Sequence, residues 1–304
     1  MSQRDVKNRI GSVKNIQKIT RAMEMVAAAR LRRAEQRIAA LRPYASAIRR
    51  MTRQAAEAAG GEVSGLPILA EHDQVSTVGL LLVTGDRGLA GAFNSQIIRA
   101  GIRASTAHES EGHEPRWYAS GRRGVSSLVF RGKEVRGRYV GFTDRPAYAN
   151  AREIAEDLIA AYVDGEVDQV EIFYNGYISP LSQVVRRETL LPLQQATILE
   201  GDDDESEDEG RGEEKSDKHA LVDYEPDPDE ILKRLIPDYV EISVYRALLE
   251  STASEHGARM TAMRSASENA GELIEDLTLE MNRARQAEIT QEIMEVVAGA
   301  EGLG

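Results

Sequence analysis

Two long helical segments at the ends of the chain constrain the fold more than any other feature. Residues 3–58 contain one proline, Pro43, and one glycine, Gly11, and the C-terminal segment contains no proline after Pro237. A helix of about 50 residues extends about 75 Å, which is too long to be buried inside a domain of ordinary size. Each segment therefore needs a partner helix along most of its length.

Apolar residues repeat at steps of three and four in both segments, which is the helical period. Small residues dominate the middle of the C-terminal stripe, so a partner helix can approach closely. We therefore expect a thin antiparallel coiled coil. The predicted stripes are Ile10, Val13, Ile16, Ile19, Met23, Val26, Leu31, Ile38 and Leu41 in the first segment, and Ile242, Tyr245, Leu249, His256, Met260, Met263, Ala266, Ala270, Ile274, Leu277, Met281 and Ala284 in the second.

The charge of the chain is segregated between these two ends. The formal net charge is −12, yet residues 1–53 hold 14 Lys and Arg against three acidic residues. Residues 238–301 hold 13 Asp and Glu against five Arg. Opposite charges on segments of similar length favour pairing of the two ends. The alternative is two independent surface helices.

Between the terminal segments the pattern changes to short apolar strands that alternate with helices. This alternation is typical of a compact, mainly parallel α/β sheet. The predicted fold class is α/β, with a Rossmann-like domain at residues 75–195 carried on the coiled coil of residues 1–58 and 229–304. The predicted strands are residues 78–84, 116–119, 170–175 and 182–191, and the predicted helices are residues 92–104 and 149–163.

An acidic run at residues 201–217 (GDDDESEDEGRGEEKSD) lies between the α/β region and the C-terminal helix. Mutual repulsion and the lack of apolar residues predict a solvated linker over residues 196–228. An acidic partner-binding element is the alternative.

The glycine-rich segment 85–91 (GDRGLAG) follows a predicted strand, where phosphate-binding loops often lie. Its glycines are spaced G-x-x-G-x-x-G, which is neither the dinucleotide-binding nor the P-loop pattern. We therefore interpret the segment as tight turns that join a strand to a helix, and we predict no cofactor.

Metal and catalytic sites have little support in the composition. The chain has no cysteine, and its histidines are His72, His108, His113, His219 and His256. No pair of them has metal-ligand spacing on a helix, so no metal site and no catalytic residue is predicted. Arginines cluster at residues 30–37, but a continuous apolar stripe and the absence of interleaved aromatics argue against nucleic-acid binding.

Membrane insertion and export are not expected either. The uncharged stretch at residues 75–85 is too short to span a bilayer, and charged residues occupy the N-terminus where a signal peptide is apolar.

Specific motifs occur at both ends of the chain. Residues 10–20 (IGSVKNIQKIT) lead into residues 22–30 (AMEMVAAAR), and residues 284–292 (ARQAEITQE) continue to Glu295, Gly299 and Ala300. These segments resemble the N- and C-terminal signatures of the γ subunit of F-type ATP synthase, the central stalk. Gly302 departs from the family pattern and indicates a looser helix end.

Three internal segments also resemble this family: residues 84–94 (TGDRGLAGAFN), 224–228 (YEPDP) and 258–263 (ARMTAM). The resemblance therefore runs from residue 4 to residue 300. It is weakest in the acidic run and in residues 105–145.

The resemblance implies a rotor shaft rather than an enzyme. In that family the terminal helices turn inside a hexamer of alternating α and β subunits, and the catalytic residues lie on α and β. The α/β domain lies against the ε subunit and the membrane-embedded ring of c subunits. The chain would then be peripheral at the cytoplasmic face of the bacterial cell membrane, and would couple proton- or sodium-driven rotation to ATP synthesis.

The resemblance also implies roles for individual residues. Met23, Arg259, Arg285 and Gln286 match positions that contact the β subunit. The C-terminal tip would turn in a sleeve formed by α and β, through Ile289, Thr290, Glu292, Val296, Gly299 and Ala300. Two other classes of function remain open: a nucleotide-binding enzyme, and a coiled-coil scaffold subunit of another assembly.

Overall fold

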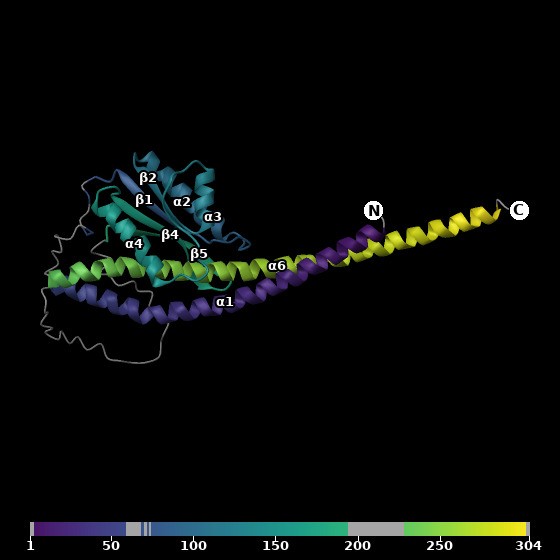
Figure 1. Cartoon of the computed structure of the whole chain (residues 1–304), viewed down its shortest axis with the longest axis horizontal. Coiled ribbons are helices and arrows are strands. Elements are labelled where there is room, and N and C mark those ends of the chain that lie inside the picture. Colours follow the sequence, from purple (N-terminus) through teal and green to yellow (C-terminus); the bar gives the residue numbers. More distant parts are fainter. Residues whose placement is uncertain (1–2, 59–67, 70–71, 73, 194–227, 302–304) are drawn as a thin grey trace.

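The chain folds into a rod of two long helices that carries an α/β domain on one side (Figure 1). The computed structural model describes residues 3–58, 68–69, 72, 74–193 and 228–301, so most of the predicted linker lies outside the described residues. Helix α1, Gln3–Ala58, and helix α6, Pro228–Glu301, run antiparallel and form the most extensive contact in the molecule. The predicted fold class is confirmed.

The seam of α1 follows alternating steps of three and four residues without interruption, which is the repeat of a coiled coil. Every seam position is buried or partly buried, and helix α1 continues through Pro43. The seam consists of Val6, Ile10, Val13, Gln17, Thr20, Glu24, Ala27, Leu31, Ala34, Ile38, Leu41, Ala45, Ile48, Thr52 and Ala55.

The predicted stripe of α1 was wrong at three positions. Ile16, Ile19 and Val26 are 53%, 59% and 52% exposed. Each precedes a seam residue by one position and is therefore rotated by about 100° around the helix. The seam takes small or polar residues here because the helices approach closely: a Cβ on Gly271 of α6 would lie 3.1 Å from the side-chain nitrogen of Gln17.

Two apolar clusters fix the antiparallel register of the rod. Near the N-terminus, Val6 and Ile10 pack with Leu277. At the other end of α1, Ile48 packs with Ile242. Helix α6 also passes through a proline, Pro237, and is longer than α1, with 74 residues against 56. The far end of α6 therefore extends past α1 (Figure 1).

The sheet of the α/β domain has five strands in the order β3-β2-β1-β4-β5. Strands β1, β2, β3 and β4 are parallel to one another. Strand β5 pairs antiparallel with β4, and the two form a hairpin. The strands are β1 (Thr77–Val83), β2 (Glu114–Ser120), β3 (Val135–Tyr139), β4 (Gln169–Ser179) and β5 (Ser182–Leu191), and the helices of the domain are α2 (Phe93–Ser110), α3 (Arg122–Phe130) and α4 (Tyr148–Val163).

The sequence prediction missed helix α3 and strand β3. Strand β3 reads VRGRY, with two arginines and a glycine in five residues, and its side chains alternate between buried and exposed. Such a short polar segment is interpretable as a strand only once its neighbour β2 is in place, because strand preference depends on the surrounding sheet.

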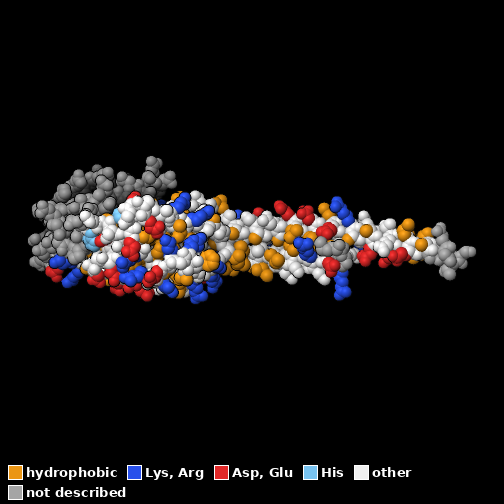
Figure 2. All heavy atoms as spheres, turned by 90° about the horizontal axis from the view of Figure 1, so that it is seen from above, with side chains coloured by type: hydrophobic (Ala, Val, Ile, Leu, Met, Phe, Trp, Pro, Cys, Tyr) orange, Lys and Arg blue, Asp and Glu red, His pale blue; other side chains and the backbone are white. Residues whose placement is uncertain are grey.

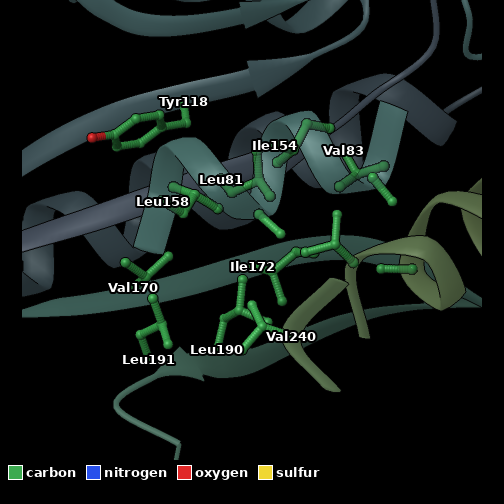
Figure 3. Close-up of a cluster of buried hydrophobic side chains, with 14 of the residues drawn as sticks. Leu81, Val83, Tyr118, Ile154, Leu158, Val170, Ile172, Leu190, Leu191 and Val240 are labelled. Carbon is green, nitrogen blue, oxygen red and sulfur yellow. The ribbon is translucent and has the colours of Figure 1, made fainter. Parts of the chain in front are cut away.

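Helices cover both faces of the sheet. On one face, side chains of α4, the sheet and α6 meet in a cluster that includes Leu158, Ile172 and Val240 (Figure 3). On the other face, α2 and α3 contribute Ile97 and Leu128. Helix α6 is thus part of the domain core and of the rod at once. In the part of the chain that the structure describes, no helix has the length and apolar character needed to span a bilayer.

Candidate functional site

Helix α6 is enclosed where it passes the α/β domain. Residues 251–257 are all buried, which is unusual for seven consecutive positions of one helix. We call residues 251–259 the buried segment. On the side of the rod, Ala253 packs with Leu31 and Ala34 of α1. The remaining sides face the α/β domain, so the segment reads STASEHGAR, small and polar rather than large and apolar.

Hydroxyl groups attach the buried segment to the backbone of the domain. Ser251 Oγ donates to the carbonyl oxygen of Val83 at 3.3 Å, and Ser254 Oγ donates to that of Asn175 at 3.0 Å. Thr252 Oγ1 donates to Thr143 O at 2.9 Å. Strands β1 and β4 and the loop after β3 are therefore attached to one helix of the rod.

An ion pair lies inside this contact. The Arg259 guanidinium donates to the Glu255 carboxylate and, at 3.3 Å, to the carbonyl oxygen of Gly88. The two side chains are only 9% and 2% exposed. Burial raises the pKa of Glu255, whereas the adjacent Arg259 opposes that rise by favouring the carboxylate. Removal of either partner would leave the other charge buried and unpaired.

The glycine-rich segment after β1 serves this contact. A Cβ on Gly85 would lie 2.7 Å from the Glu255 carboxyl group, so only glycine leaves room for that side chain. Gly88 accepts the hydrogen bond from Arg259. The glycines of this segment thus make room for the ion pair of the buried segment, which agrees with the interpretation of the segment as a structural turn.

Asp86 of the same loop holds the surrounding backbone together. Its carboxylate accepts hydrogen bonds from the backbone nitrogens of Arg122, Gly141 and Thr143. Burial alone would raise the pKa of Asp86, but these hydrogen bonds outweigh it and lower the pKa.

His256 is neutral at physiological pH. It is 1% exposed, and burial, together with the positive charge of Arg259, lowers its pKa to about 4. Its Nδ1 lies 3.3 Å from Nη1 of Arg259. The sequence placed His256 on the apolar stripe of the C-terminal segment, and the structure places it in the interior.

A second, exposed apolar stripe runs along α1. Ile16, Ile19 and Val26 are each more than half exposed, and Met23 beside them is partly buried. Met25 is 63% exposed but lies on a different side of the helix. Hydrophobic side chains are visible along the rod outside the domain (Figure 2). Apolar groups in this number on one surface are typical of an interface with another protein.

The far end of α6 is exposed on every side. Residues 285–298 are all exposed, and among them are Ile289, Ile293 and Val296. We call residues 282–301 the free end. Arg285, Gln286, Thr290 and Glu292 are exposed there, while the side chains of Gly299 and Ala300 lie outside the described residues.

The structure separates the four residues expected to contact the β subunit. Arg259 is 8% exposed and engaged within the chain, whereas Arg285 and Gln286 lie on the free end. Met23 lies beside the exposed stripe of α1. The sequence analysis missed Glu255, although its spacing of four residues from Arg259 is that of an ion pair on a helix.

Comparison with known proteins shows the family to which the chain belongs. The sequence matches the ATP synthase family over residues 2–303. It is 44% identical to the ATP synthase gamma chain of Rubrobacter xylanophilus, over 99% of this chain and 98% of the relative. It is 42% identical to that of Streptomyces avermitilis, over 98% of this chain and 94% of the relative.

Solved structures of ATP synthases also match this chain. The central stalk and c-ring structure of the Tetrahymena thermophila mitochondrial ATP synthase contains a chain with a TM-score of 0.60 and 26% identity, covering 82% of this chain and 99% of that chain. A chain of the Euglena gracilis mitochondrial ATP synthase rotor has a TM-score of 0.63 at 19% identity, covering 94% of this chain and 98% of that chain, which supports the fold alone.

These matches extend over nearly the whole chain, and they include both terminal helices and the α/β domain. This chain belongs to the ATP synthase gamma chains, the central rotor stalks of F-type ATP synthases.

Proposed function

We propose that this chain turns inside a hexamer of α and β subunits and transmits rotation from a ring of c subunits to the catalytic sites. The observation that carries the proposal is that α6 is fixed to the domain at one end and exposed at the other. A rod of this kind transmits a displacement of the domain to its free end. The ε subunit and the c ring would contact the domain end of the rod.

The rod is asymmetric around its axis because two helices of different sequence form it, and this asymmetry is what coupling requires. An asymmetric shaft in a ring with threefold pseudosymmetry presents a different surface to each of three sites at one rotor angle. Each angle therefore favours one conformation at one site, which is a coupling free energy between rotor angle and site affinity. The catalytic residues lie on the other subunits, and the coupling ion is a proton or sodium.

Individual residues would serve this coupling in different ways. We propose that Arg285 and Gln286 meet the β subunit from the free end, and that Met23 meets it from α1. Arg259, about 39 Å below Arg285 along the helix, contributes to the β contact through the shape of the buried segment, since Glu255 already pairs its guanidinium. The bearing tip would consist of Ile289, Thr290, Glu292, Val296, Gly299 and Ala300.

Location follows from these contacts. The chain would be peripheral at the cytoplasmic face of the bacterial cell membrane, held there through the c ring.

The test is steady-state ATP turnover by the reconstituted complex with Arg285→Ala or Gln286→Ala in this chain. A hydrogen bond to a charged group is worth about 1.5–3 kcal/mol, so loss of one at a coupling angle should lower turnover by about tenfold or more. Single-site catalysis should change much less, because the chemistry belongs to other subunits.

Arg283→Ala is the matched control, since Arg283 is also exposed on the free end and has no predicted contact. The proposal for these residues fails if the substituted complexes assemble and turn over at the parental rate. It also fails if the control lowers turnover equally.

A further inference from the structure

Three metal-ligating side chains converge at the C-terminal end of α2, on the α/β domain and away from the rod contacts described above. Nδ1 of His108 lies 3.5 Å from Nδ1 of His113. A carboxylate oxygen of Glu111 lies 3.8 Å from the first nitrogen and 3.7 Å from the second. The three atoms form a nearly equilateral triangle.

The size of this triangle fits a tetrahedral zinc ion. Nitrogen and oxygen ligands lie about 2.0–2.2 Å from zinc, so two ligands of one tetrahedral ion are about 3.4 Å apart. The three observed separations exceed this value by a few tenths of an ångström. Small rotations of the more exposed Glu111 and His113 side chains would close the difference. The fourth coordination position would face solvent and take water.

The backbone holds the ligands in place. Helix α2 ends at Ser110, and the chain reverses through Gly112, whose φ of +90° suits glycine. The amide of His113 then donates to the carbonyl oxygen of His108 at 2.9 Å. The sequence analysis considered spacings on a helix and missed this pair, because the turn after the helix brings together residues five apart.

A buried carboxylate orients the first histidine. Nε2 of His108 lies 3.2 Å from an oxygen of Glu171, whose side chain is 3% exposed. In the tautomer in which Nε2 donates to Glu171, Nδ1 keeps its lone pair for the triangle. Nε2 also lies 3.3 Å from a guanidinium nitrogen of Arg187. Arg187 donates to both oxygens of Glu171, at 2.7 and 3.0 Å, and thereby holds the carboxyl group in position. Histidine ligands of zinc commonly have such a carboxylate behind them.

We propose that His108, Glu111 and His113 form a binding site for a divalent transition-metal ion, with zinc as the best fit. Two imidazole nitrogens and one carboxylate suit zinc in preference to magnesium or calcium, which favour oxygen ligands. A bound ion would join the C-terminus of α2 to the start of β2 and stabilise this edge of the domain. The site is independent of rotor function.

The alternative is that the cluster binds no metal and that a hydrogen bond joins the two histidines. His113 would then donate from Nδ1 to Nδ1 of His108, although 3.5 Å is longer than the usual range of about 2.7–3.2 Å for a hydrogen bond from nitrogen. In that case the cluster would have no particular affinity for metal.

The experiment titrates zinc chloride into the chelator-treated full chain by calorimetry at neutral pH, with cobalt absorption as a report of coordination geometry. We expect about one ion per chain, tetrahedral cobalt bands, and a higher melting temperature with zinc. His113→Gln and Glu111→Gln should each weaken binding about tenfold or more. Both positions are partly or fully exposed, so the variants should fold.

Glu109→Gln is the matched control, because Glu109 lies on the same turn but pairs with Lys133. His219→Gln tests whether the histidine next to the acidic run binds metal instead. Both controls should retain the parental affinity. The proposal is overturned if the parent chain does not bind zinc, if either ligand variant binds within about twofold of the parent, or if either control loses the site.

Discussion

Helix α6 passes through two environments that differ in almost every respect. In the buried segment, seven consecutive residues are enclosed, and hydroxyl and charged groups are paired with the domain. In the free end, residues 285–298 are exposed, and Ile293 and Val296 face solvent. Polar residues are therefore inside and apolar residues outside within one helix.

This inversion separates two uses of the same helix. The buried segment is built for attachment, since its small residues let the domain backbone approach and its polar groups satisfy that backbone. The free end leaves apolar surface uncovered, which is costly in an isolated chain and useful only when another protein covers it. Substitutions in the first should change folding stability, whereas substitutions in the second should change function in the complex.

The largest effect should come from Arg259→Ala. Loss of the guanidinium leaves Glu255 buried without its partner, which costs about 3–5 kcal/mol in the free energy of unfolding. Urea unfolding of the isolated chain measures this loss. Arg285→Ala on the free end should change stability by less than about 0.5 kcal/mol.

Replacement of both partners should restore much of that loss. Glu255→Met combined with Arg259→Met removes both charges and keeps most of the volume, so stability should exceed that of Arg259→Ala. Equal stability of Arg259→Ala and Arg285→Ala would remove the distinction between the two regions.

A smaller, pH-dependent effect should come from His256. Its folded pKa of about 4 lies below the unfolded value of 6.5, so the unfolded chain binds more protons between these limits. The stability that depends on neutral His256 is fully present above pH 6.5 and is lost as the pH falls toward 4. About 2 kcal/mol should be lost by pH 5, as measured by urea unfolding across this range.

His256→Gln isolates this contribution, because nearby Glu255 and the other carboxylates titrate in both chains. The variant should show a shallower dependence of stability on pH between 6.5 and 5. Parallel curves for the parent and the variant would mean that His256 is solvated rather than enclosed.

The seam between the two regions should be sensitive to volume more than to salt. Ala270 is buried against the N-terminal part of α1, so Ala270→Leu should destabilise the chain by about 1–3 kcal/mol through overpacking. Exposed ion pairs contribute about 0–1 kcal/mol each, so high salt should matter less. Thermal unfolding in low and high salt compares the two effects.

Ala287→Leu makes the same change on the exposed free end and should leave stability unaltered. A larger effect of salt than of Ala270→Leu would show that charge dominates the pairing. One ion pair between the helices joins Arg264 of α6 to Glu24 of α1, and its signs are opposite to the overall charge segregation.

The smallest effect should come from deletion of residues 202–215 in the acidic run. The run has no apolar residues with which to reach a core, so helicity and assembly should stay nearly unchanged. Circular dichroism and co-purification with the partner subunits measure both. Loss of assembly would identify the run as an interaction element.

Agreement between sequence and structure was best where the determinant is local. The period of apolar residues predicted two long helices, and continuous apolar runs predicted β1 and β4 to within a few residues. Strand β5 was also predicted, but its antiparallel pairing depends on the hairpin with β4. Helix α3 and strand β3 were missed because their sequences are short and polar.

Which of two similar candidate residues is buried was decided only by the tertiary structure. Ile16 and Gln17 both fit a helical stripe, and the more apolar of the two is exposed because the helices approach too closely there to accommodate it. Arg259 and Arg285 were both expected to contact the β subunit, yet the domain encloses only the first. His108 and His113 are brought together by a turn. Periodicity determines which segments are helices, whereas burial depends on what other parts of the chain lie beside each position.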